Sequence, residues 1–349
     1  MQKKDYIIVG LGLAGLAACE WLERLGKSFV VIDSNQEAAS KVAAGLYNPV
    51  ILKRYTMPWR AIEQFDLAMQ FYGGLEEKLG VPILQKLPLQ KVFSSVEDQN
   101  NWFAASDRVG LNRFVKPRLV KNENQNIITP FDFGEVQETG RIDIKKLLEE
   151  YRDYLNERNC IISERFDHEK VELHKDGVTY KDHKVNRIIF AEGYGLKNNP
   201  YFNTLPLVGN KGEYLLIKAP DLQLTEAVKS SFFIVPLGDN HYKVGATFNW
   251  EDKNWKTTDT AKSELIEKLK KLIDCDFEVI DQEAGMRPTT GDRRALIGVH
   301  PKHSQLAVLN GLGTRGIMAG PYLSKILINH LVAAATIPEE IDIKRFLNK

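Results

Sequence analysis

The chain has 349 residues, enough for two packed domains. Its 47 basic and 46 acidic residues leave a net charge of +1, which argues against an extended nucleic-acid-binding surface. The three cysteines, Cys19, Cys160 and Cys275, lie far apart and in no metal-ligand spacing, so we expect reduced thiols, no metal site and a cytoplasmic location. Polar residues interrupt the most apolar stretch, 319–335, and an apolar strand begins almost at the N-terminus. We therefore expect neither a membrane span nor a signal peptide.

The first elements form a dinucleotide-binding pattern. An apolar strand at 6–9 runs into Gly10-Leu-Gly12-Leu-Ala-Gly15, an amphipathic helix follows to Gly26, and a second strand at 29–32 ends at Asp33. The glycines permit the tight turn and the close approach of a pyrophosphate, while the helix N-terminus attracts its charge. Asp33 is expected to accept hydrogen bonds from ribose hydroxyls. The pattern fits FAD or NAD, and Asp33 disfavours the 2′-phosphate of NADP.

The middle of the chain alternates helices and strands. Residues 40–49 read as an extended loop of small residues, and a helix is expected from Pro58 to Leu79. A second helix is expected over 142–157, a β-hairpin over 171–180, and a buried strand over 185–191.

The remainder begins with strands and ends in a helix. Residues 205–250 read mostly as strands, 258–273 as an amphipathic helix and 277–285 as a strand. The last elements are a strand at 306–309, a glycine-rich loop and a helix to about 335. Strand–helix–strand segments therefore lie at the start, middle and end of the chain, and a strand-rich block interrupts them.

The order of short motifs resembles the D-amino-acid oxidase superfamily, closest to glycine oxidase and sarcosine-oxidase-like flavoenzymes. The resemblance runs over nearly the whole chain. It rests on the following segments: GLGLAG with Asp33, Ala43-Ala-Gly45 before Pro49, Phe190-Ala-Glu-Gly193, Lys211-Gly-Glu213, Ile234-Val-Pro236 with Val244-Gly-Ala-Thr247, Gly285-Met-Arg-Pro288 with Asp292 and Ile297-Gly298, and Gly311-Leu-Gly-Thr-Arg-Gly316.

This resemblance implies an α/β fold with two interleaved domains. A Rossmann-like FAD-binding domain of the glutathione-reductase type would comprise 1–80, 140–200 and 285–349. A mixed-sheet α+β substrate domain would comprise 81–139 and 201–284. The implied cofactor is non-covalent FAD, since no cysteine falls in a flavin-proximal motif.

The resemblance also assigns cofactor-binding residues. The ADP half would lie on the N-terminal turn and strand end, the flavin and pyrophosphate beside 43–46, the adenine near Val171, the ribityl chain near 191–193, and the pyrimidine end of the flavin against 313–318. These residues are Gly10, Gly12, Leu13, Ala14, Gly15, Asp33, Ser34, Ala43, Ala44, Gly45, Leu46, Val171, Ala191, Gly193, Gly313, Thr314, Gly316, Ile317 and Met318.

Two arginines are candidates for anion recognition. In the family, the arginine that corresponds to Arg287 grips the substrate carboxylate, which a guanidinium does through paired hydrogen bonds. The alternative is a structural ion pair with Asp292 or a neighbouring glutamate. Arg315 precedes a helix, where a cation is unfavourable unless an anion such as a substrate carboxylate or reduced flavin is near. The alternative is a solvated arginine on a surface loop.

The chain departs from the glycine oxidase pattern at Phe233, where those enzymes carry a tyrosine whose hydroxyl helps to hold the carboxylate. Either the substrate lacks a carboxylate there or another group such as Tyr47 replaces the hydroxyl. Lys243 occupies an offset at which the sarcosine oxidase branch carries an oxygen-activating lysine. The alternative for Lys243 is a solvated side chain on an edge strand.

The implied reaction is oxidation of the carbon–nitrogen bond of a small amino acid or secondary amine, with hydride transfer to flavin N5 and oxygen as acceptor. Three alternatives remain. One is a dehydrogenase that uses a carrier, with a 2-hydroxy acid or an amine as substrate. Another is an oxidase of a modified tRNA nucleoside, because 45–49 and 311–316 also resemble the oxidase domain of the bifunctional tRNA wobble-uridine modification enzyme. The third is a non-catalytic flavin-binding subunit. A homo-oligomer is possible.

Overall fold

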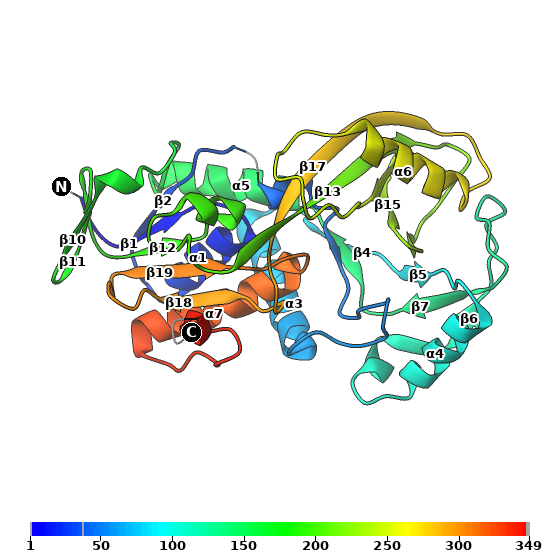
Figure 1. Ribbon diagram of the computed structural model, residues 1–349, viewed down its shortest axis with the longest axis horizontal. Helices are drawn as coiled ribbons and strands as arrows, with labels where there is room; N and C mark the ends of the chain where they lie inside the picture. Colours follow the sequence, from blue (N-terminus) through cyan, green and yellow to red (C-terminus); the bar gives the residue numbers. More distant parts are fainter. Residues whose placement is uncertain (1, 37, 347–349) are drawn as a thin grey trace.

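The computed structural model describes residues 2–36 and 38–346. Its first sheet runs in the order β10-β11-β12-β1-β2-β9, with β19 and β18 joined beside β12 (Figure 1). Its parallel strands are β1 (Gln2–Val9), β2 (Phe29–Ile32), β9 (Ile161–Ile162), β12 (His183–Phe190) and β19 (Leu306–Asn310). The antiparallel members are the hairpin of β10 (Val171–His174) and β11 (Gly177–Tyr180), and β18 (Leu296–Val299).

Both faces of the first sheet are buried, which explains why its strands read as continuous apolar runs. Tyr6 and Ile8 of β1 pack with α1 (Leu13–Arg24), α3 (Ala61–Leu79), α5 (Ile144–Glu157) and α7 (Gly316–Ala333). Ile7 and Val9 point to the opposite face, where the β10–β11 hairpin and the 3₁₀ segment Gly193–Asn198 supply apolar partners. The alternation of side chains along one strand thus joins two separate cores.

The second sheet runs in the order β17-β13-β16-β15-β14-β5-β7-β6. Its strands come from two parts of the chain: β5 (Leu89–Lys91), β6 (Val115–Val120) and β7 (Phe133–Val136), then β13 (Leu207–Lys218), β14 (Ala227–Lys229), β15 (Phe233–Gly238), β16 (His241–Gly245) and β17 (Glu278–Thr290). The helix α6 (Asp259–Lys270) packs Leu265 and Leu269 against one face, which also buries Tyr242 and Val244. The helix α6 does not cover the opposite face of the second sheet.

Smaller elements connect the two sheets. The helix α4 (Val96–Ser106) packs beside β6, and α2 (Ala39–Val42) lies against β17. A short third sheet joins β3 (Leu46–Tyr47), β8 (Gly140–Ile142) and β4 (Leu84–Lys86). In Figure 1 the long strands β13 and β17 run from the second sheet, on the right, towards the first sheet, on the left.

The chain order of these elements agrees with the sequence expectations, while several boundaries differ. The hairpin at 171–180 is confirmed. The helix expected from Pro58 begins at Ala61, because Arg60 adopts a left-handed conformation before it. The strand expected over 277–285 continues to Thr290, so Arg287 lies inside β17 and the domain boundary proposed at residue 285 falls within one strand. No helix among the described residues is long and apolar enough to cross a membrane.

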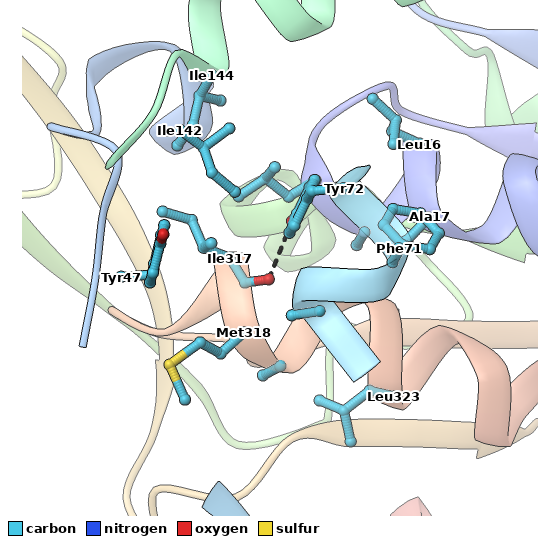
Figure 2. Close-up of a cluster of buried hydrophobic side chains, with 14 of the residues drawn as sticks. Leu16, Ala17, Tyr47, Phe71, Tyr72, Ile142, Ile144, Ile317, Met318 and Leu323 are labelled. Atoms are coloured by element: carbon cyan, nitrogen blue, oxygen red, sulfur yellow. Dashed lines mark hydrogen bonds between the residues drawn. The ribbon is translucent and has the colours of Figure 1, made fainter. Parts of the chain in front are cut away.

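The start of α7 is held by two hydrogen bonds from distant helices. Pro321 lies inside α7 and has no N–H, so the carbonyl four residues earlier, on Ile317, has no donor within the helix. The buried Tyr72 of α3 donates its hydroxyl to that carbonyl at 2.9 Å (Figure 2). Trp21 of α1 donates its indole N–H to the carbonyl of Pro321 at 2.8 Å. Three helices far apart in sequence are thereby joined where α7 begins.

This arrangement predicts a non-additive pair of substitutions. Tyr72→Phe leaves the buried Ile317 carbonyl without a partner, which is expected to cost about 1–3 kcal/mol of the free energy of unfolding. Pro321→Ala restores an N–H that can donate to the same carbonyl, so Tyr72→Phe is expected to cost less in that background. Denaturant unfolding of the four proteins of this cycle measures the difference. An equal cost of Tyr72→Phe in both backgrounds would contradict the account.

Candidate functional site

A cavity of about 1170 Å³ lies between the two sheets. Its wall combines the carboxyl ends of β1, β2 and β12, the segment 38–53, the exposed face of the second sheet and the loop before α7. Most of the candidate residues meet there. These are Gly10, Gly12, Leu13, Ala14, Asp33, Ser34, Ala43, Ala44, Gly45, Leu46, Tyr47, Ala191, Gly193, Phe233, Arg287, Gly313, Thr314, Arg315, Gly316, Ile317 and Met318.

The N-terminal turn packs closely enough to require its last glycine. A β-carbon at Gly15 would lie 1.9 Å from the carbonyl oxygen of Gly10, so Gly15 lies beneath the turn instead of at the cavity wall. Gly12 is the N-cap of α1 and has no side chain to accept from the first helical turn. That turn therefore presents N–H groups and the positive end of the helix dipole to the cavity.

Asp33 holds the turn as well as facing the cavity. Its carboxylate accepts hydrogen bonds from the backbone N–H groups of Leu11 and Asn35, both at 2.9 Å. It also pairs with the guanidinium of Arg152 on α5, a partner that the sequence analysis did not find. Arg152 lies more than a hundred positions away on an amphipathic helix, where no local pattern distinguishes it from a surface charge.

A second group missed from the sequence lies at the end of β12. Glu192 lines the cavity, and its two carboxylate oxygens bond to His168 Nε2 at 3.0 Å and Asn199 Nδ2 at 2.7 Å. The motif Phe190-Ala-Glu-Gly193 indicated the position, but the partners come from two other segments. These contacts fix the backbone beside Ala191 and Gly193.

The Arg287 side chain packs over Gly212 of the neighbouring strand, where any larger residue would collide with it. It is 9% exposed, and its Nη1 donates to Asn210 Oδ1 at 2.8 Å and to the Thr247 carbonyl at 3.2 Å. A β-carbon at Gly212 would lie 2.0 Å from Arg287 Nη2, so the guanidinium passes directly over Gly212. The ring of Phe248 covers it, with 4.7 Å between the guanidinium carbon and the ring centroid.

Among the described residues, no carboxylate lies within ion-pair distance of Arg287. The alternative ion pair with Asp292 is wrong, because Asp292 accepts from Arg345 Nε at 3.0 Å. A buried guanidinium that is hydrogen-bonded only to neutral oxygens retains a full positive charge in a low-dielectric setting. This is the electrostatic condition of a site built for an anion.

Arg315 presents a second cation to the same cavity. It precedes the first turn of α7 and is half-buried, and its Nη1 lies 3.4 Å from the Asn48 carbonyl. Burial lowers the pKa of its guanidinium to about 10. The alternative of a fully solvated surface arginine is therefore wrong. Among the described residues, Arg315 has a neutral hydrogen-bond partner and no carboxylate within ion-pair distance.

Phe233 and Tyr47 line the cavity from different elements. Phe233 lies in register with Gly245 on β16, which itself lies opposite Tyr214 on β13, so these three residues share the cavity face of the second sheet. Tyr47 lies in the third sheet, and its hydroxyl is directed over Gly140, where a β-carbon would lie 2.1 Å from that oxygen. Burial raises the pKa of Tyr47. Its role as a replacement for the missing tyrosine hydroxyl stays a prediction.

Besides Gly15, two candidates do not reach the wall of the cavity. Val171 is half-buried in β10, and Phe166 lines the cavity on that side. Lys243 shares the cavity face of the second sheet with Val235, its register partner, but its ammonium pairs with Glu283 at 2.5 Å. The alternative of a solvated lysine on an edge strand is wrong, because β16 lies between β13 and β15 and the Lys243 side chain is 11% exposed.

The comparison with known proteins identifies the family. The sequence profile described as FAD dependent oxidoreductase (DAO) matches residues 5–330. The chain belongs to this family. It is therefore an FAD-dependent oxidoreductase with a mixed α/β fold.

Individual relatives agree with this assignment. The chain is 25% identical over 350 residues to glycine oxidase of Bacillus subtilis (strain 168), which covers 92% of this chain and 91% of that protein. The crystal structure of glycine oxidase from Geobacillus kaustophilus superimposes with a TM-score of 0.82 at 20% identity, covering 97% of this chain and 96% of that one. A third match, 25% identical over 179 residues, is to the tRNA 5-methylaminomethyl-2-thiouridine biosynthesis bifunctional protein MnmC of Idiomarina loihiensis (strain ATCC BAA-735 / DSM 15497 / L2-TR). It covers 48% of this chain and 29% of that protein.

The residues of the cavity fit FAD. In the first turn of α1, only the Leu13 N–H has a side-chain acceptor within the described chain, Ser40 Oγ, so this turn suits a pyrophosphate. Asp33 lies at the end of β2 where a ribose belongs, and Arg315 adds a cation to the cavity wall. Basic residues outnumber acidic ones among the described residues of the wall, which favours an anionic dinucleotide and an anionic substrate together.

Non-covalent attachment predicts a simple outcome on denaturation. The three cysteines do not line the cavity, so we expect no thioether to the flavin. Acid precipitation of the purified protein is expected to leave the yellow colour in the supernatant, where absorbance and chromatography identify FAD. Colour that stays in the washed pellet would contradict this prediction.

Proposed function

We propose that this enzyme oxidises the carbon–nitrogen bond of a small amino acid or secondary amine, with molecular oxygen as the final acceptor and hydrogen peroxide as product. The observation that carries the proposal is Arg287, a buried guanidinium with no carboxylate partner among the described residues, at the wall of the cavity that fits FAD. The glycine oxidase relatives support a substrate of this class.

Arg287 supplies the binding energy and the orientation. Asn210 and the Thr247 carbonyl hold Nη1 from behind, while Gly212 leaves room for the guanidinium to lie flat on the sheet. The planar group then offers its other N–H donors to a carboxylate. A substrate anchored in this way has its α-carbon and nitrogen above Gly245 and Tyr214, because those residues are next along the cavity face.

When bound, FAD would supply the hydride acceptor for the substrate carbon beside the nitrogen, and the imine product would hydrolyse in water. The protein has to position the amine and exclude competing water. Phe233, Tyr214 and Val235 form an apolar floor beside Arg287 for that purpose. An apolar floor also favours a neutral amine over an ammonium, so the hydride can leave without a protein base.

Loss of Arg287 is expected to weaken substrate binding strongly. Arg287→Ala removes one partner of a desolvated charge pair, which costs about 2–5 kcal/mol, or about 30-fold to several thousand-fold in affinity at ~1.4 kcal/mol per tenfold. Arg287→Lys is also expected to bind the substrate weakly, because the point charge of an ammonium cannot replace the paired hydrogen bonds of a guanidinium. The measurement is anaerobic flavin bleaching against the concentration of glycine, sarcosine and D-alanine.

A matched control separates this effect from misfolding. Arg113→Ala removes an arginine that pairs with Asp66 and Glu138 and does not line the cavity. This substitution is expected to leave the bleaching curves unchanged. Each variant is compared at equal FAD content. An Arg287→Ala enzyme with the wild-type concentration dependence would exclude the carboxylate role.

The choice of oxygen as acceptor generates a prediction for Lys243. Lys243 belongs to the face of the second sheet that borders the cavity, although its ammonium is paired with Glu283 and does not line the wall. A cation there would stabilise superoxide as it forms, so Lys243→Met is expected to slow reoxidation of the reduced enzyme in stopped-flow experiments while leaving anaerobic reduction nearly unchanged. Glu283→Gln removes the opposing charge and is expected to leave reoxidation equal or faster. Reoxidation at the wild-type rate in Lys243→Met would remove the role from Lys243.

A further inference from the structure

A third cation, the half-buried Lys229 on β14, lies in the same cavity and has none of the roles proposed above. Lys229 is half-buried and lines the cavity beside Phe233, with 4.6 Å between its Nζ and the ring centroid. Its register partner on β15 is Phe233, and its partner on β5 is Lys91, so all three side chains share one face of the sheet. Sequence analysis passed over Lys229 because it belongs to no motif.

Within the described chain, the neighbouring lysines form ion pairs with carboxylates, whereas Lys229 does not. Lys91 pairs with Asp98 at 2.8 Å, and Lys268 pairs with Glu264 at 2.5 Å. Within the described part of the chain, the Lys229 ammonium donates to the Ser230 carbonyl at 2.6 Å and has no carboxylate within ion-pair distance. Two of its three N–H donors are therefore free to meet a ligand in the cavity.

Burial, followed by the charges of Lys91 and Lys268, lowers the pKa of Lys229 to about 8. The protein thus holds this ammonium in a setting that disfavours its charge and supplies no anion of its own. An anion in the cavity would restore the balance, as it would for Arg287.

The positions of the two cations define a spacing. The Lys229 ammonium lies between the Ser230 carbonyl, next to the end of β14, and the Phe233 ring on β15, and the Arg287 guanidinium lies over Gly212 on β13. The two groups are separated by two to three strand spacings across the sheet and about two residues along it, roughly 12–16 Å. With each carboxylate carbon about 4 Å from its cation, the two carboxylates would lie about 4–8 Å apart. That is the separation within one small dicarboxylic amine.

We propose that Lys229 is a specificity-determining residue that binds a second carboxylate of the substrate, while Arg287 binds the first. The inference rests on the proposed function and narrows its substrate to dicarboxylic amino acids or N-carboxymethyl amines. It also accounts for Phe233. A phenylalanine gives up the hydroxyl that a monocarboxylic substrate uses and provides a ring face against which the Lys229 ammonium rests.

Two matched substrate pairs test the proposal. Iminodiacetate differs from sarcosine by one carboxylate on the nitrogen substituent, and D-aspartate differs from D-alanine by one carboxylate on the side chain. The wild-type enzyme is expected to show a higher kcat/KM for the dicarboxylic member of at least one pair. In Lys229→Met this preference is expected to fall about 10- to 100-fold, and Lys229→Arg is expected to keep most of it.

The control variant is Lys268→Met, which removes a nearby lysine that does not line the cavity and is expected to leave the preference within about twofold. Absence of a dicarboxylate preference in both pairs, or the same preference in wild type and Lys229→Met, would overturn the assignment. If none of the four compounds reduces the flavin, the proposed function itself fails, which is a different outcome.

A binding experiment gives a readout independent of turnover. Thiodiacetate and (methylthio)acetate replace the amine by sulfur, so neither is an amine substrate nor carries a titrating nitrogen. The perturbation of flavin absorbance reports their Kd. Because thiodiacetate requires the charged form of Lys229, its affinity relative to (methylthio)acetate is expected to fall as pH rises above about 8. A preference for thiodiacetate over (methylthio)acetate that is the same in the wild type and in Lys229→Met at pH 7 would overturn the proposal.

Discussion

The carbonyl of Ile317, left without a helical donor by Pro321, is the point at which the architecture is tied together. Tyr72 of α3 donates a hydrogen bond to it, and Trp21 of α1 donates to the carbonyl of Pro321 itself. The helix that begins the dinucleotide site and the helix that ends the chain are thereby held against one another. Because α7 starts at this junction, the preceding loop and Arg315 are fixed at the cavity wall. An interaction inside the core thus sets the position of a charge at the site.

The cavity is built around positive charges that the described protein leaves uncompensated. Arg287, Arg315 and Lys229 are partly or wholly buried, and each is hydrogen-bonded only to neutral groups. Elsewhere the chain pairs comparable cations with carboxylates, as at Arg113, Lys91 and Arg152. The contrast indicates that the unpaired charges reduce stability in exchange for anion binding, since a buried cation without a counter-ion is unfavourable until a ligand arrives. Under the proposed function, the flavin and the carboxylates of the substrate would offset these charges.

Much of this molecule could be predicted from local pattern. The glycine spacing with its flanking strands determined the dinucleotide turn, continuous apolar runs determined a sheet buried on both faces, and seven ordered motifs determined the family. Most of the candidate cofactor residues also line one cavity. These features succeed because each depends on residues that are neighbours in sequence, where backbone geometry and side-chain period act directly.

Only the tertiary structure decided which charges are paired. Arg152 meets Asp33, Lys243 meets Glu283 and Asp292 meets Arg345 across long separations, whereas Arg287 and Lys229 meet no carboxylate in the described chain. Lys229 could not be singled out in the sequence because it belongs to no motif. The sequence by itself determined the dinucleotide turn, which follows from short-range spacing, and the order of its motifs determined the family and, through the family, FAD as the cofactor. The choice between a structural ion pair and a free cation depends on which strands become neighbours, and sheet order is a property of the folded chain alone.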